Sequence, residues 1–131
     1  MKHFSSQVLT TLVDLTILDG QFTITSTSGT VGSVQGNEIS AVVHAATGET
    51  GKFKVVLNDK FNKLITIVPR VRCSAFSNVA TVEIIADNVA ASGSFTMQCY
   101  NLSGAAVDPA NSSIVSFVAL VRQSGVKRQG E

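Results

Sequence analysis

Few side chains in this sequence are suited to catalysis or metal binding. His3 and His44 are the only histidines, and Cys73 and Cys99 are the only cysteines. A nucleophilic triad needs a base beside its nucleophile, and a zinc site gathers several histidines, cysteines or carboxylates. Spacing identifies no partner for either histidine, so we expect His44 on the polar face of a strand. These residues predict no enzyme, no metal site and no cofactor.

Carboxylates are the next candidates, because glycoside hydrolases use a pair of them. Most acidic residues here lie in expected turns or on polar strand faces, where a solvated side chain is the simpler interpretation. Asp108 precedes Pro109 and is expected in a turn. The acidic residues considered are Asp14, Asp19, Glu38, Glu49, Asp59, Glu83, Asp87 and Asp108.

The two cysteines both fall on the apolar side of expected strands. Spacing alone does not show that Cys73 and Cys99 meet. We expect two buried free thiols, with a disulfide as the alternative.

The charge balance argues against two classes of partner. The net charge is +1, which gives no field to recruit nucleic acid or an anionic membrane. The segment 8–18 is interrupted by polar residues and is shorter than the roughly 20 apolar residues that span a bilayer. We therefore expect a soluble protein that is made in a reducing cytoplasm.

The lysines cluster in sequence, whereas the arginines do not. Lysines on an exposed strand commonly prevent edge-to-edge pairing, and we interpret Lys52 and Lys54 in this way. The role of Arg70, Arg72 and Arg122 stays open.

Apolar and polar residues alternate with the period of a β-strand through most of the chain. The clearest case is the segment 93–102, whose apolar face consists of Phe95, Met97 and Cys99. The segment 51–67 has the same pattern on both sides of a turn at Asn58-Asp59. Its first half places Phe53, Val55 and Leu57 on one face.

Several other segments follow the same pattern. Asp19-Gly20 is expected to form a tight turn between two strands of a hairpin. The segment 38–46 is expected to turn Ile39, Ala41, Val43 and Ala45 to one face. The segment 64–73 is expected to turn Ile65, Ile67, Val71 and Cys73 to one face. Pro69 within it cannot donate a ladder hydrogen bond, so that strand must lie at an edge or carry a bulge.

The last expected strand, 113–123, is apolar on both faces. One face consists of Val115, Phe117, Ala119 and Val121. The other consists of Ile114, Val118 and Leu120. Such a strand is either central in a sandwich or buried against another subunit.

Length and strand count together predict the fold class. A chain of 131 residues suits one domain with a single core. Eight to nine short strands with short connections and no long helix indicate an antiparallel β-sandwich. We expect an N-terminal arm with the first strand at 1–19, the sandwich at 20–124 and a polar tail at 125–131. Charged residues make up only 15% of the chain, against about 25% in typical domains, which suits close packing of subunits.

Three segments taken together carry a resemblance to a known group of proteins. They are Gly29-Thr-Val-Gly-Ser-Val-Gln-Gly36, the segment from Thr47-Gly48 to Phe61, and the segment from Gly104 to Arg122. Their order resembles small structural proteins of tailed bacteriophages, which include capsid decoration (cement) proteins and fibre or tail modules. The resemblance spans about residues 20 to 124. It implies a jelly-roll-like sandwich, commonly trimeric, on the exterior of the virion.

The expected function is therefore that of a non-enzymatic virion structural protein. A decoration protein binds the outer surface of the capsid and stabilises the head through added interface area. Its partners would be the major capsid protein and copies of itself, here as a homotrimer. Ile114, Val118 and Leu120 are the suspected subunit interface, and Phe4, Val8, Leu9 and Leu12 are the suspected capsid-contact arm.

An alternative function is a fibre or tail appendage module that recognises a host glycan. Sugar-binding proteins usually offer aromatic platforms. This chain has no tryptophan and one tyrosine, which disfavours the alternative.

Overall fold

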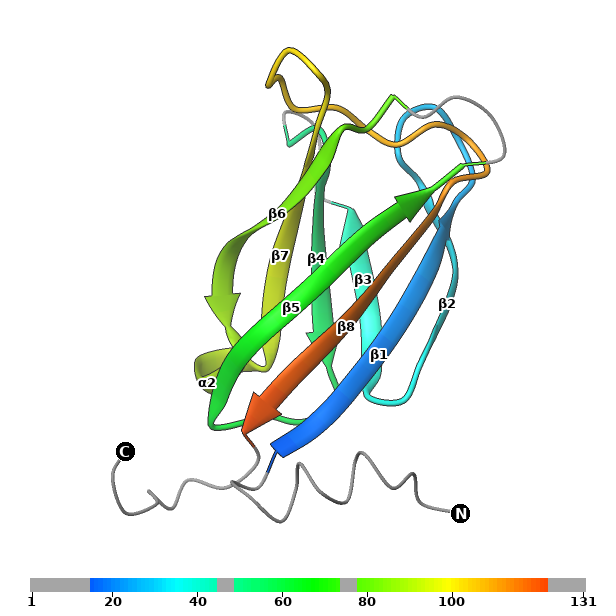
Figure 1. Ribbon diagram of the computed structural model, residues 1–131. Coiled ribbons are helices and arrows are strands. Elements are labelled where there is room, and N and C mark those ends of the chain that lie inside the picture. The colour runs from blue at the N-terminus through cyan, green and yellow to red at the C-terminus, as the bar shows by residue number, and fades with distance from the viewer. Residues whose placement is uncertain (1–14, 45–48, 74–77, 123–131) are drawn as a thin grey trace.

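The computed structural model describes residues 15–44, 49–73 and 78–122. These residues form two four-stranded antiparallel sheets, packed face to face (Figure 1). Sheet A has the strand order β2-β1-β8-β5, and sheet B has the order β3-β4-β7-β6. The predicted antiparallel β-sandwich is confirmed, with eight strands.

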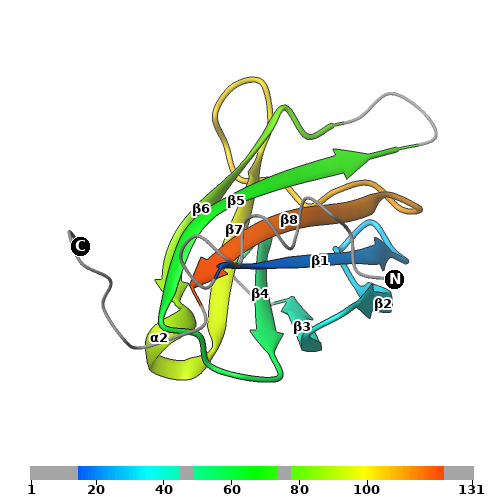
Figure 2. The ribbon, with the colours of Figure 1, turned by 60° about the horizontal axis from the view of Figure 1, so that its bottom comes forward.

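The elements have short connections, and a single turn of helix joins two of them. The strands are β1 (Leu15–Ile24), β2 (Val31–Gly36), β3 (Ile39–His44), β4 (Lys52–Leu57), β5 (Lys63–Arg72), β6 (Thr81–Asn88), β7 (Ser94–Tyr100) and β8 (Ile114–Arg122), and the helix is α2 (Val89–Ser92). The strands of the two sheets cross at a clear angle, which Figures 1 and 2 both show.

The core lies between the inner faces of the sheets and is built around phenylalanine rings. Phe22 of sheet A and Phe53 of sheet B have ring centroids 5.2 Å apart. Phe95 and Phe117 meet edge to face at 5.1 Å, a favourable arrangement for aromatic pairs. The predicted inner faces of β4, β7 and β8 are confirmed, since their apolar residues are buried.

The turn predicted at Asp19-Gly20 is wrong, because β1 continues through it. Gly20 lies opposite Phe117 on one side and Gly36 on the other. A Cβ atom at Gly20 would lie only 2.7 Å from the Phe117 ring and would also collide with Ile39. The glycine is therefore explained by close packing of these two side chains, and the aspartate before it made it look like a turn.

The face predicted for β3 is correct at Ile39, which packs against the core, but wrong at Ala41 and Val43, which are exposed. A bulge between Ile39 and Ala41 shifts the register against β4, and one extra residue exchanges the two faces of a strand. As a result, Val42 packs against the core. Val43 is 49% exposed.

In β5 a similar bulge lies between Leu64 and Thr66. Leu64 packs against the core, and Ile65 is 39% exposed, so the inward placement of Ile65 was wrong. The prediction for Pro69 is confirmed, since β5 is an edge strand of sheet A.

The interpretation of Lys52 and Lys54 as edge guards is wrong. Both belong to β4, which lies between β3 and β7 in the interior of sheet B. The position of a strand within its sheet depends on partners distant in sequence, which alternation does not report.

Sheet A begins before the boundary expected at residue 19. Residues 15–19 belong to β1, and Leu18 is buried in the core. Leu15 lies opposite Arg122, so β1 starts beside the end of β8. The suspected arm residues Phe4, Val8, Leu9 and Leu12, and the tail 125–131, lie outside the described residues.

Candidate functional site

The outer face of sheet A carries apolar side chains that lie side by side. In the register of the sheet, Val118 of β8 is directly opposite Val68 of β5. Leu120, the next outward residue of β8, is opposite Ile17 of β1. Val68 is 59% and Val118 is 53% exposed. We call Ile17, Val68, Val118 and Leu120 the apolar patch.

The same face is hollowed next to the patch, where polar side chains gather, and Val68 and Val118 also line this hollow. A hollow of about 360 Å³ is lined by residues that include Asp19, Gln21, Gln35 and Arg70. A second hollow of about 250 Å³ shares Gln21, Arg70 and Ser116 with the first. We call this continuous depression the arginine groove. Its full lining is Asp19, Gly20, Gln21, Gln35, Gly36, Val68, Arg70, Arg72, Ile114, Ser116, Phe117 and Val118.

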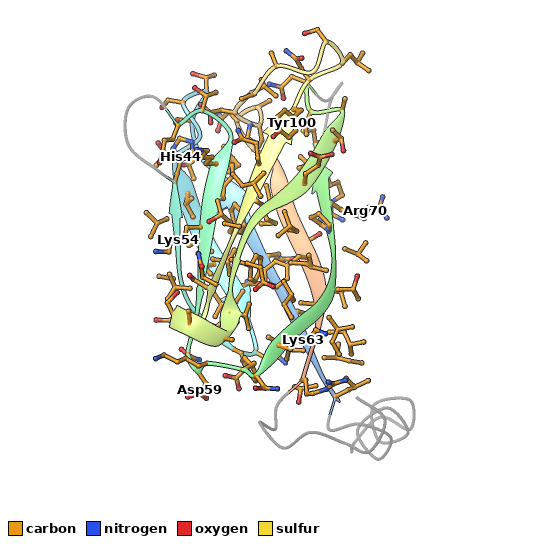
Figure 3. All side chains as sticks on the ribbon, turned by 90° about the vertical axis from the view of Figure 1, so that its left-hand side faces the viewer. His44, Lys54, Asp59, Lys63, Arg70 and Tyr100 are labelled. Carbon is orange, nitrogen blue, oxygen red and sulfur yellow. The ribbon has the colours of Figure 1, made fainter. Side chains whose placement is uncertain are left out.

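The suspected interface residues all lie on the outward face of β8 and belong to one or both of these two regions. Leu120 belongs to the apolar patch, Val118 belongs to the patch and also lines the arginine groove, and Ile114 lines the groove next to Arg72. Their contact with another subunit stays a prediction. Arg70, whose role the sequence left open, points away from the sandwich in Figure 3.

The outer face of sheet B is different, because polar residues separate its exposed apolar ones. Val43 is opposite Lys54, and Lys54 is opposite Thr96. Thr96 in turn is opposite Ala86, next to Ile85, which is 42% exposed. Figure 3 shows Lys54 on the opposite side of the sandwich from Arg70.

His44 has a partner that the sequence did not reveal. Its Nε2 atom lies 2.7 Å from Oδ1 of Asp108, and the backbone N–H of Gly51 donates to the same oxygen at 2.7 Å. The His44 ring also packs on Phe53, with centroids 4.8 Å apart. The expectation that His44 lies on a polar surface is wrong, because the bulge in β3 turns it inward.

This cluster fastens the loop before β8 to the start of β4. Asn78 strengthens the attachment: its side chain donates to the carbonyl of Asp108 and accepts from the N–H of Ala110. His44 and Asp108 are 64 positions apart in the chain. No local sequence pattern therefore indicates that they meet.

The buried thiol near this cluster is held in its neutral form. Burial, and to a smaller extent the negative charge of Asp108, raise the pKa of the Cys99 thiol from 9.0 to about 12. A thiol with a raised pKa is a poor nucleophile at neutral pH. Across residues 15–44, 49–73 and 78–122, no serine, threonine or cysteine side chain forms a hydrogen bond with His44. The same residues contain no group of three or more His, Cys, Asp or Glu side chains that could hold a metal ion.

Both cysteines are free, as expected, but only Cys99 is buried as expected. Cys99 is fully buried. Cys73 is only partly buried, and its Sγ atom lies 2.7 Å from the Ser113 hydroxyl.

Comparison with protein-family models, curated proteins and solved structures finds no match for this chain. Within the part of the chain that the structure describes, no helix has the length and apolar character needed to cross a bilayer. The surfaces described above are therefore interpreted from their own chemistry.

Proposed function

We propose that the protein is a non-enzymatic structural protein of a phage virion, of the capsid-decoration type, and that it self-associates through the apolar patch. The expected partners are copies of itself, as a homotrimer, and the major capsid protein on the exterior of the head.

The observation that carries this proposal is the cross-strand pairing of exposed apolar residues on the outer face of sheet A. Val68 and Val118 are neighbours in the sheet and are both more than half exposed. Leu120 and Ile17 extend the same surface by one residue pair. Contiguous exposed apolar surface marks interaction sites, whereas single exposed apolar residues are normal.

The rigidity of the face supports the same proposal. β8 is paired along its length with β1 and β5, so its outward side chains are presented on a fixed backbone. Interfaces that form from preorganised surfaces lose less conformational entropy on binding. The sequence resemblance to decoration proteins adds the virion and the capsid to this picture.

The first experiment is size-exclusion chromatography with light scattering on the full chain. We expect a mass near three chains, about 41 kDa from a 13.7 kDa chain. A mass of 13.7 kDa that does not change with concentration would contradict self-association.

The second experiment tests the arm and the location on the particle. Removal of residues 1–14 leaves β1 intact, whereas removal of 1–19 would also delete buried Leu18. We expect the shorter truncation to keep the oligomer and to lose binding to phage heads that lack the protein. Unchanged head binding would refute the arm, and density for the chain on the tail would refute the decoration role.

A further inference from the structure

Two arginines on β5, Arg70 and Arg72, are exposed at alternate positions of the strand. Arg70 lies opposite Ser116, and Ser116 lies opposite Gln21. Gln21 donates its amide to the side chain of Gln35 on β2 at 3.2 Å. One row of hydrogen-bonding side chains thus crosses all four strands of sheet A.

The arginines of this groove have no partner among the described residues. Neither Arg70 nor Arg72 forms a hydrogen bond or ion pair with residues 15–44, 49–73 or 78–122. Both are exposed. A guanidinium offers a planar pair of donors that matches a carboxylate, so the groove presents two unused anion-binding groups.

The opposite side of the groove carries a negative charge. Asp19 of β1 is exposed and lines the same 360 Å³ hollow as Arg70. A second anionic group of a ligand would be repelled there, whereas a hydroxyl group would donate a hydrogen bond to the carboxylate. The groove is therefore polarised, with cations on the β5 side and an acceptor on the β1 side.

The backbone groups of the two central strands of sheet A are not available to bind a ligand. β1 and β8 each have neighbours on both sides, so their backbone N–H and C=O groups are used within the sheet. A bound peptide would find few partners for its own backbone in the groove. Amide, hydroxyl and carboxylate side chains instead suit a ligand with several hydroxyl groups.

We propose that the arginine groove binds an acidic saccharide, with the sugar carboxylate on Arg70 and Arg72 and its hydroxyl groups along Gln21, Gln35 and Asp19. The hollow of about 360 Å³ falls in the range of small-molecule sites. Aromatic platforms are not needed, because charge and hydrogen bonds hold this ligand. The proposal goes beyond the structural role, since it assigns a ligand to a groove that adjoins the apolar patch and shares Val68 and Val118 with it.

The test is isothermal titration calorimetry of the full chain. The salt concentration is about 0.15 M, because exposed charges more than about 8 Å apart are then largely screened and non-specific attraction is weak. The probes are trigalacturonate and 3′-sialyllactose as acidic saccharides, maltotriose as a neutral saccharide and hexaglutamate as an acidic peptide. We expect saturable binding of at least one acidic saccharide and none of maltotriose. The two acidic probes distinguish a uronate from a sialate.

Three variants locate the site. Arg70→Gln should weaken binding by about tenfold or more, because a charged hydrogen-bond donor is lost. Lys54→Gln removes a cation from the outer face of sheet B and should leave binding unchanged. Asp19→Asn should weaken saccharide binding a few-fold, whereas it would strengthen binding at a simple anion site. Thermal unfolding of each variant shows that the fold is retained.

Several outcomes would overturn the proposal. They are the absence of saturable binding by both acidic saccharides, an Arg70→Gln variant that binds as the parent does, and tighter binding by Asp19→Asn. Hexaglutamate binding as tightly as the saccharide would identify an acidic peptide site instead. The mass of Arg70→Gln is also measured by light scattering. An unchanged mass shows that a loss of saccharide binding in this variant does not result from a loss of self-association.

Discussion

The two outer faces of the sandwich contain similar residues but arrange them differently. On sheet A, exposed Val68 and Val118 are opposite each other in neighbouring strands. On sheet B, exposed Val43 is opposite Lys54, which separates it from the next strands. The continuity of apolar surface, and not the number of apolar residues, distinguishes the two faces.

The faces also differ in where their unpaired charged side chains lie. Near sheet B, Lys52 pairs with Glu49 at 3.6 Å, and the amide of buried Gln98 donates to the carbonyl of Thr50 at 2.6 Å. On sheet A, Arg70 and Arg72 have no partner among the described residues. Lys54 of sheet B also has no hydrogen bond or ion pair with the described residues, but it separates Val43 from the neighbouring strand, whereas Arg70 of sheet A lines the same hollow as Val68 and Val118.

The largest effect is expected from a charge placed in the apolar patch. Val118→Asp should raise the dissociation constant of the oligomer about 100-fold or more, because burying an unpaired carboxylate is costly. The measurement is light scattering across a dilution series.

Val43→Asp is the matched control for this variant. It places the same charge on a valine of similar exposure on sheet B, and it should leave the oligomer intact. Equal dissociation by both variants would contradict the assignment of the interface to sheet A.

The next effect concerns the fastening of the loops at the His44 cluster. Asp108→Ala should lower the free energy of unfolding by about 2–3 kcal/mol, because the Gly51 N–H and His44 both lose a charged acceptor. Chemical denaturation measures this change.

Asp108→Asn keeps one oxygen acceptor and should fall between the parent and the alanine variant. Self-association should persist in both, since the cluster is outside the apolar patch. Substitutions at ordinary surface positions change the free energy of unfolding by less than about 0.5 kcal/mol. A loss this small in Asp108→Ala would show that the cluster does not fasten the loops.

A smaller effect is expected at high pH from Cys99. The pKa of the folded thiol is about 12, against 9.0 for the ordinary thiol. The unfolded chain therefore loses this proton first, so the stabilising contribution is complete below pH 9 and is lost as the pH rises toward 12. The slope should approach about 1.4 kcal/mol per pH unit.

Denaturation of the parent and of Cys99→Ala between pH 8 and about 11 measures this slope. The difference in stability between them should shrink as the pH rises, because alanine has no proton to lose. A constant difference would show that the Cys99 thiol does not titrate differently in the two states.

The smallest effect tests whether placing exposed apolar side chains next to each other is enough to create an interaction surface. Lys54→Val would join the exposed valine at position 43 to a second valine on sheet B. We expect a few-fold gain in self-association, because the new contiguous apolar surface remains small. Sedimentation velocity measures the gain, and Lys54→Ser serves as the control that removes the charge alone.

The class of fold and most inward faces could be predicted from the sequence. Phe53 and Val55 in β4, and Phe95 and Met97 in β7, are buried as their alternation predicted. The edge position or bulge required by Pro69 also followed from its missing N–H. These features depend on the geometry of one strand, in which successive side chains point to opposite faces.

The candidate site was visible in the sequence only in part. The two-faced pattern of β8 pointed to Val118 and Leu120, which lie in the apolar patch. It did not indicate that Val68 lies beside Val118, or that Arg70 shares a groove with Gln21. Those neighbours come from strands distant in the chain, and the pairing of β8 with both β1 and β5 decides them.

The sequence by itself determined the β class, most strand positions apart from the false turn inside β1, and the outward side of β8. The tertiary structure decided the faces of β3 and β5, the interior place of Lys54, the close packing at Gly20 and the contact of His44 with Asp108. The physical reason is that alternation is a property of the local backbone. Bulges, strand order and contacts between loops are set by which distant segments pack together, and they place Val68 and Arg70 on the surface that we expect to interact.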